Sequence, residues 1–115
     1  MRLHDWNSLP KEQLNPRVSR KVVHLENLTL AQIGLRKHAL VPQHSHVHEQ
    51  VSMVQQGAVK FHVDGREQIV HAGEFLAIPP RAPHSVEALE DSIVVDVFSP
   101  VREDWIRGED SYLRR

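Results

Sequence analysis

The sequence predicts an all-β domain, and three observations support this fold class. Short apolar runs recur along the chain, separated by residues that favour turns. No segment between residues 18 and 98 keeps a helical spacing of apolar residues over three turns. Aromatic residues make up only 5% of the chain, so a core must be built from Val, Leu and Ile, which suit strands. Roughly eight strands at 8–12-residue spacing indicate a sandwich or a barrel.

The predicted strands lie between an N-terminal arm and a C-terminal tail. Residues 1–17 are polar and contain Pro10 and Pro16, so we expect an irregular arm. Residues 18–100 form the predicted barrel, and residues 101–115 form a mostly charged tail with a helical turn at 103–106. Within the barrel the expected strands are residues 22–25, 28–33, 51–54, 58–63, 68–70, 75–78 and 92–98.

The turns between these runs are marked by glycine and proline. Asp64-Gly65 is the strongest short hairpin signal in the chain, and it separates two of the predicted strands. Gln56-Gly57 and Ala72-Gly73 mark further turns, and Pro79-Pro80 ends the strand before it. These signals support many short strands in preference to a few long ones.

Length and composition limit the functions to consider. A chain of 115 residues forms one domain, and a net charge of −1 gives no electrostatic reason to expect nucleic acid or a membrane as a partner. The absence of cysteine excludes disulfides and thiolate metal sites. The N-terminal residues lack the apolar stretch of a signal peptide, so a cytoplasmic location is expected. Nine histidines are an unusually high number, and their positions carry the argument.

The densest group of histidines is the segment His44-Ser45-His46-Val47-His48. Alternate side chains of a strand share a face, so we expect His44 and His46 to point to the same side. Two neutral imidazoles so arranged form half of a metal site. The alternative is a pair of solvated histidines on an exposed strand.

Further candidate ligands follow this segment in the chain or compete within it. His84 follows after enough chain for a barrel to return it to the first two histidines. Gln50 lies just beyond the histidine segment, and Glu49 or His48 compete with it as the fourth ligand. Three imidazoles and one amide oxygen accept Ni, Zn, Mn, Fe or Co, so the metal identity stays open.

The spacing of these residues resembles the two motifs of the cupin family. His44-x-His46, then three residues, Gln50, six residues and Gly57 is similar to the first motif, in which two histidines and a carboxylate bind metal. Gly73, five residues and Pro79, followed by Arg81 and His84, is similar to the second motif. The resemblance implies a double-stranded β-helix, the cupin jelly-roll barrel. It also implies one divalent metal ion bound by His44, His46, Gln50 and His84.

The chain departs from these motifs at three positions of interest. His38 stands where the first motif opens with glycine, and Arg81 replaces a glycine of the second motif. Gln50 stands in place of the usual glutamate. A neutral amide leaves the charge of the ion unneutralised, which strengthens its pull on an anionic substrate but weakens its binding to the protein.

The last predicted strand contains a carboxylate. Asp96 and Phe98 share a face of this strand, and a carboxylate in an apolar strand is costly unless it meets a partner or a site. The alternative is an aspartate that faces solvent at the strand end. Arg102 follows shortly after, at a position where a surface arginine is the ordinary interpretation.

A narrower resemblance covers residues 18–105. His-Ser-His-x-His-x-Gln together with Asp-Val-Phe-Ser-Pro-x-Arg-Glu-Asp is similar to the small cupins of the KdgF type, which act in pectin and alginate breakdown. The resemblance implies conversion of 4,5-unsaturated uronate monosaccharides to linear 4-deoxy-5-keto sugar acids. It places the catalytic aspartate on Asp96 and further pocket residues on Phe98 and Arg102. We therefore predict Asp96 as general acid/base and Arg102 as a bidentate clamp for the substrate carboxylate.

Two other functions remain open from the sequence. One is an iron-dependent dioxygenase or lyase, because three histidines suit Fe(II), although such sites commonly carry Glu where Gln50 stands. The other is a cupin that binds or stores a small molecule without turnover, which an outward-facing Asp96 or an Arg102 far from the metal would favour. Small cupins of this kind are commonly homodimers, so we also expect a homodimer.

Overall fold

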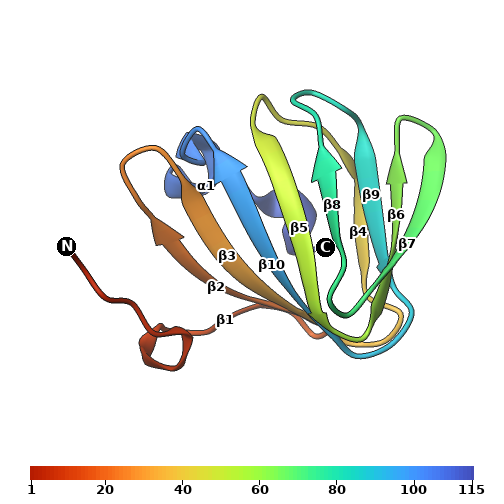
Figure 1. Ribbon diagram of the computed structural model, residues 1–115, viewed down its shortest axis with the longest axis horizontal. Helices are drawn as coiled ribbons and strands as arrows, with labels where there is room; N and C mark the ends of the chain where they lie inside the picture. The colour runs from red at the N-terminus through yellow and green to blue at the C-terminus, as the bar shows by residue number, and fades with distance from the viewer.

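The computed structural model describes residues 1–115, and its strands form two antiparallel sheets that face each other (Figure 1). The larger sheet has the order β1-β2-β3-β10-β5-β8, and the smaller sheet has the order β4-β9-β6-β7. The strands are β1 (Glu12–Asn15), β2 (Val18–His24), β3 (Thr29–Leu35), β4 (Leu40–His44), β5 (Glu49–Gln56), β6 (Ala58–Val63), β7 (Arg66–His71), β8 (Phe75–Ile78), β9 (His84–Ala88) and β10 (Ser92–Ser99).

Two long-range insertions give the sheets their jelly-roll connectivity. Strand β10 lies between β3 and β5, and β9 lies between β4 and β6. The register of β10 against β5 places Asp96 opposite Ser52 and Phe98 opposite Gln50. The register of β9 against β4 places His84 opposite His44. The predicted all-β jelly roll is confirmed, and these pairings position the site.

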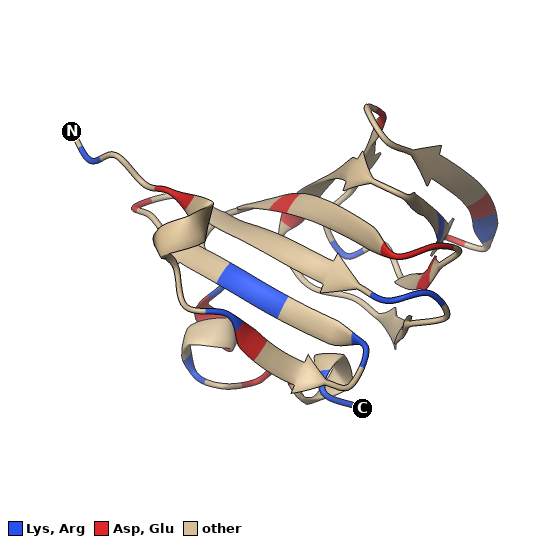
Figure 2. Ribbon diagram, turned by 90° about the horizontal axis from the view of Figure 1, so that it is seen from below, with Lys and Arg blue, Asp and Glu red and all other residues tan.

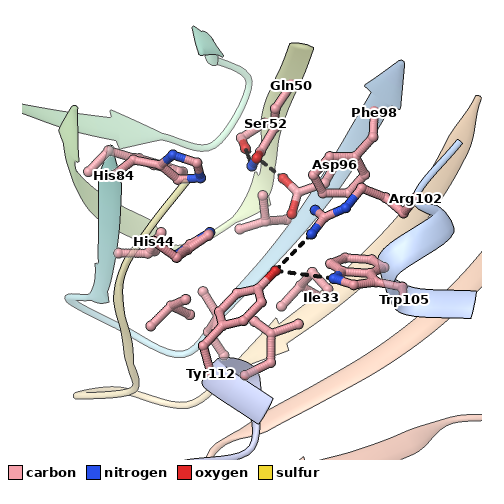
Figure 3. Close-up of a pocket in the computed structure, with 16 residues that line it drawn as sticks. Ile33, His44, Gln50, Ser52, His84, Asp96, Phe98, Arg102, Trp105 and Tyr112 are labelled. Carbon is pink, nitrogen blue, oxygen red and sulfur yellow. Dashed lines mark hydrogen bonds between the residues drawn. The ribbon is translucent and has the colours of Figure 1, made fainter. Parts of the chain in front are cut away.

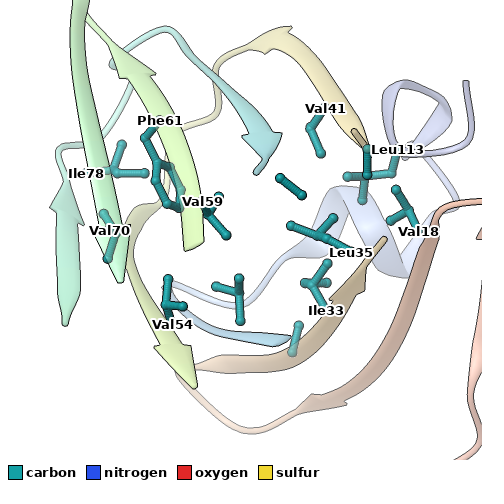
Figure 4. Close-up of a cluster of buried hydrophobic side chains, with 14 of the residues drawn as sticks. Val18, Ile33, Leu35, Val41, Val54, Val59, Phe61, Val70, Ile78 and Leu113 are labelled. Carbon is teal, nitrogen blue, oxygen red and sulfur yellow. The ribbon is translucent and has the colours of Figure 1, made fainter. Parts of the chain in front are cut away.

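The core fills the space between the two sheets (Figure 4). Strands that alternate buried and half-buried residues supply it, as in β3, where every second side chain points inward. Phe61 is 2% exposed, and Figure 4 shows it beside Ile78 and Val59. Full burial of each such side chain stabilises the fold by about 1.5–3 kcal/mol.

The arm and the tail are more ordered than the sequence predicts. Within the arm, η1 (Trp6–Ser8) is a 3-10 turn and β1 pairs with β2, so the irregular part is shorter than residues 1–17. Strand β1 was not predicted from the sequence, because it is short and mostly polar and lacks apolar alternation. The tail forms the predicted helical turn α1 (Glu103–Ile106) and a second turn, η2 (Ser111–Leu113).

Local turn chemistry behaves as the sequence predicts. The Asp64-Gly65 turn joins β6 and β7, and both residues have positive φ, 50° and 77°, which matches the twist of the two strands.

Basic and acidic residues are mixed along the strands and loops (Figure 2). None of the helices has the length and apolar character needed to cross a bilayer.

Candidate active site

Three histidines converge at one end of the barrel. His44 ends β4, His84 begins β9, and the nitrogen atoms of His44, His46 and His84 that could bind metal all lie within 4.8 Å of one another. The sequence predicted that His44 and His46 share a face of one strand. This expectation was partly wrong, because β4 ends at His44 and His46 lies in the following loop. The pairing of β4 with β9, and not strand alternation alone, therefore brings the cluster together.

Backbone carbonyls orient two of these rings. Nδ1 of His44 lies 2.8 Å from the Pro42 oxygen, and Nδ1 of His84 lies 2.8 Å from the Ala82 oxygen. Each Nδ1 therefore carries the ring proton and donates a hydrogen bond to the carbonyl oxygen, which leaves Nε2 with a free lone pair. Nε2 of His84 is buried without any hydrogen-bond partner, which a bound ion would satisfy.

Burial also keeps the histidines neutral. Loss of solvent is the main cause that lowers the pKa of His44 to about 4 and that of His46 to about 3. The pKa of His84 is lowered for the same reason. A metal binds only the neutral imidazole, so the three rings are ready for an ion near neutral pH.

Gln50 completes the donor set. Its amide oxygen lies 3.0 Å from Nε2 of His46, and two ligands about 2.1 Å from one ion and at right angles to it lie about 3 Å apart. Glu49 is exposed on the opposite face of β5. Nε2 of His48 lies 3.2 Å from the Val101 carbonyl oxygen and outside the cluster. Among the three alternatives, the geometry favours Gln50, and the residues present fit a divalent metal.

Asp96 faces the same pocket as the histidines. The Ser52 hydroxyl donates a 2.6 Å hydrogen bond to Oδ1 of Asp96, and the Gln50 amide donates to the Ser52 oxygen at 2.9 Å. Burial raises the pKa of Asp96 to about 6, although the Ser52 hydrogen bond and the charge of Arg102 oppose the shift. A carboxyl group with such a pKa can both take up and release a proton near neutral pH. The sequence offered no signal for Ser52.

Arg102 lines the pocket but is already bound on one edge. Its Nε and Nη2 donate to Asp104 at 3.0 and 2.8 Å, and its guanidinium lies over the rings of Phe98 and Trp105 at 4.6 and 4.2 Å. The side chain is 1% exposed. A bidentate clamp through this edge would require Arg102 to release Asp104. Of the three guanidinium nitrogens of Arg102, only Nη1 has no hydrogen bond in the protein.

Tyr112 is a pocket residue that the sequence analysis did not identify. It comes from η2, and its ring stacks on His44 with centroids 4.3 Å apart (Figure 3). The pocket has a cavity volume of about 50 Å³ and opens to solvent. His44, Gln50, Ser52, His84, Asp96, Phe98, Arg102, Trp105 and Tyr112 all line it. The predicted residues are thus brought together by both sheets and by the tail.

Two motif departures have a common backbone explanation. His38 and Arg81 stand where cupin motifs carry glycine, and both have positive φ, 74° and 67°. This left-handed conformation favours glycine, because a Cβ atom crowds the neighbouring carbonyl oxygen there. The chain therefore keeps the turn geometry of the motifs without their glycines.

Comparison with known proteins identifies the family. The sequence model described as a cupin domain matches residues 33–99, which include all four candidate metal ligands. The protein is a cupin. The match begins in β3 and ends with β10, so the tail that carries Tyr112 lies outside it.

The cupin is also similar to proteins named KdgF. It is 28% identical over 100 residues to the pectin degradation protein KdgF of Dickeya dadantii, covering 84% of this chain and 91% of that protein. The structure of KdgF from Halomonas sp. superposes with a TM-score of 0.85 at 28% identity, covering 91% of this chain and 98% of the other. An RmlC-like cupin from Shewanella frigidimarina gives the same TM-score and identity, with 91% and 96% covered.

A more distant likeness concerns the fold alone. Oxalate decarboxylase of Bacillus subtilis has a TM-score of 0.75 at 22% identity, and the match covers 86% of this cupin but 29% of that enzyme. The KdgF proteins instead match this cupin along nearly their full length. The cupin is therefore KdgF-like in sequence and fold.

Proposed function

We propose that this cupin is a metal-dependent enzyme that converts 4,5-unsaturated uronate monosaccharides to linear 4-deoxy-5-keto uronates. The observation that carries the proposal is the position of Asp96, which lines the same pocket as Arg102 and two of the clustered histidines, His44 and His84. The similarity to KdgF proteins over most of the chain supports the substrate class.

The reaction needs one proton to be moved. The hydroxyl proton at C1 leaves, the bond between C1 and the ring oxygen breaks, an aldehyde forms at C1, and C4 gains a proton as the C5 ketone forms. Asp96 in its carboxylate form accepts the first proton and returns it to C4. The hydrogen bond from Ser52 holds Oδ1 of Asp96, so the other oxygen is free to face the substrate.

The remaining residues of the pocket bind the metal ion and orient the substrate. His44, His46, Gln50 and His84 would hold a divalent ion, which when bound would stabilise the negative charge that develops on the ring oxygen. Arg102 places a permanent positive charge in the pocket wall, which favours an anionic substrate. Phe98 packs under this guanidinium and holds it in place.

An ultraviolet assay tests the proposal directly. Ketonisation removes the conjugated double bond, so metal-loaded protein should accelerate the loss of absorbance of freshly prepared 4,5-unsaturated galacturonate. A chelator should abolish the acceleration. Asp96→Asn should abolish it with unchanged metal content, whereas Glu49→Gln, an exposed carboxylate on β5, should retain it. A rate equal to the spontaneous one with metal bound, or an active Asp96→Asn protein, would contradict the proposal.

A further inference from the structure

The hydroxyl of Tyr112 is held in an unusual hydrogen-bonding state. Its oxygen accepts a hydrogen bond from Nη2 of Arg102 at 3.0 Å and another from Nε1 of Trp105 at 3.1 Å (Figure 3). A phenolic oxygen accepts at most two hydrogen bonds, so its lone pairs are both engaged. The hydroxyl proton itself has no acceptor in the protein, and the group lines the pocket.

The position of this donor is fixed by contacts to the tyrosine ring and to the neighbouring backbone. The ring of Tyr112 stacks on His44, one of the candidate metal ligands, with an interplanar angle of 26°. Leu113, the next residue, is buried in the core, and the side chain of Asn15 donates to its carbonyl oxygen at 3.1 Å. A donor held this firmly gives up little conformational entropy when it binds a ligand.

A second anchor holds the tail that carries Tyr112. Asp110, 3% exposed, forms a 2.8 Å ion pair with Arg20, which is 4% exposed, and a 3.0 Å pair with Arg114. Arg20 in turn lies over the ring of Trp105 at 4.7 Å. The tail is therefore docked against β2 and the pocket wall, and Tyr112 belongs to the pocket as a built component.

The unpaired donors near Tyr112 match a carboxylate. Nη1 of Arg102 also has no hydrogen bond in the protein, and Figure 3 shows the guanidinium between Asp96 and the Tyr112 hydroxyl. One N–H and one O–H on neighbouring groups suit the two oxygens of a substrate carboxylate. This arrangement substitutes for the bidentate arginine clamp, whose edge Asp104 occupies.

We propose that Tyr112 is a specificity-determining residue whose hydroxyl donates a hydrogen bond to the carboxylate of a uronate, beside Nη1 of Arg102. The proposal deepens the proposed function and rests on it for the identity of the substrate. It assigns a binding role to the tail, which lies outside the matched cupin domain.

Tyr112→Phe is the informative variant, because it keeps the ring on His44 and removes only the hydroxyl. With 4,5-unsaturated galacturonate, we expect KM to rise about tenfold and kcat to change less than twofold, as for loss of one hydrogen bond to a charged group. Unchanged KM would overturn the proposal. The melting temperature of the variant should fall, because Nη2 of Arg102 and Nε1 of Trp105 lose their acceptor. A single cooperative melting transition and a metal content equal to that of the wild type establish that the variant folds and binds metal.

A binding experiment separates this proposal from the proposed function. Calorimetry with saturated galacturonate and with its methyl ester needs no turnover. The metal-loaded wild type should prefer the acid, and Tyr112→Phe should lose most of that preference. Asn15→Ala loosens the tail but keeps the hydroxyl, so it should lower the melting temperature while preserving the preference. Equal acid-to-ester ratios in the wild type and Tyr112→Phe would overturn the role of Tyr112, whatever the ketonisation assay finds.

Discussion

The Ser52 hydroxyl donates a 2.6 Å hydrogen bond to the carboxylate of Asp96 across the β5–β10 pair. Because the Gln50 amide donates to the same serine oxygen, Ser52 links a candidate metal ligand to the proposed acid/base group. This connection exists only because β10 inserts beside β5.

Removal of this link should impair turnover without emptying the metal site. In Ser52→Ala, Asp96 loses the hydrogen bond that orients it, so we expect kcat to fall about tenfold. Ser85→Ala, on β9 and without a side-chain hydrogen bond, is the matched control and should keep full activity. Steady-state kinetics and metal analysis check the prediction, which fails if Ser52→Ala turns over like the control.

The fourth ligand can be identified by metal affinity. Gln50→Ala should weaken binding of a divalent ion at least tenfold, measured by competition with a fluorescent chelator, because a coordinating oxygen is lost. Glu49→Ala should bind as the wild type does, since Glu49 points to solvent. Gln50→Glu should bind metal more tightly, because a carboxylate neutralises part of the ion's charge. The opposite ranking of Gln50→Ala and Glu49→Ala would transfer the ligand role to Glu49.

The left-handed backbone at His38 predicts a stabilising substitution. His38→Gly should raise the free energy of unfolding by about 0.5–1 kcal/mol, because relief of the Cβ clash outweighs the added flexibility of the unfolded chain. Lys37→Gly, at the exposed neighbour without positive φ, should instead lower it. Urea denaturation measures both. A destabilised His38→Gly protein would mean that the imidazole makes a contribution beyond its backbone.

The buried Arg20–Asp110 ion pair predicts an acid-sensitive tail. Hydrogen bonds from Arg114 and Arg20 hold the pKa of Asp110 below its usual value. A lowered pKa stabilises the fold above the unfolded pKa of about 4, and this stabilisation is lost as the pH falls through the folded pKa. Asp110→Asn should therefore cost roughly 3 kcal/mol at pH 7 and progressively less below about pH 4.

Urea denaturation at several pH values tests this dependence. Glu26→Gln, which changes an exposed carboxylate without an ion pair, should leave the stability unchanged throughout the range. A difference between wild type and Asp110→Asn that stays constant from pH 7 to pH 3 would show that the charge of Asp110 does not stabilise the tail.

The local features of this protein were predictable because neighbouring residues determine them. Apolar runs and turn residues predict the all-β class, and Asp64-Gly65 predicts its hairpin from backbone preference alone. The local spacing pairs His44 with His46, and the resemblance to the second cupin motif adds His84 to them before the structure is known.

The tertiary structure decided which of these residues act together. Strand pairing brings His84 to His44, buries Gln50 while exposing Glu49, and turns Asp96 toward the pocket. It also docks a charged tail through Asp110, which places Tyr112 in the pocket wall. Such contacts join residues far apart in the chain, so they depend on sheet order and register, which the local pattern of a single sequence does not encode.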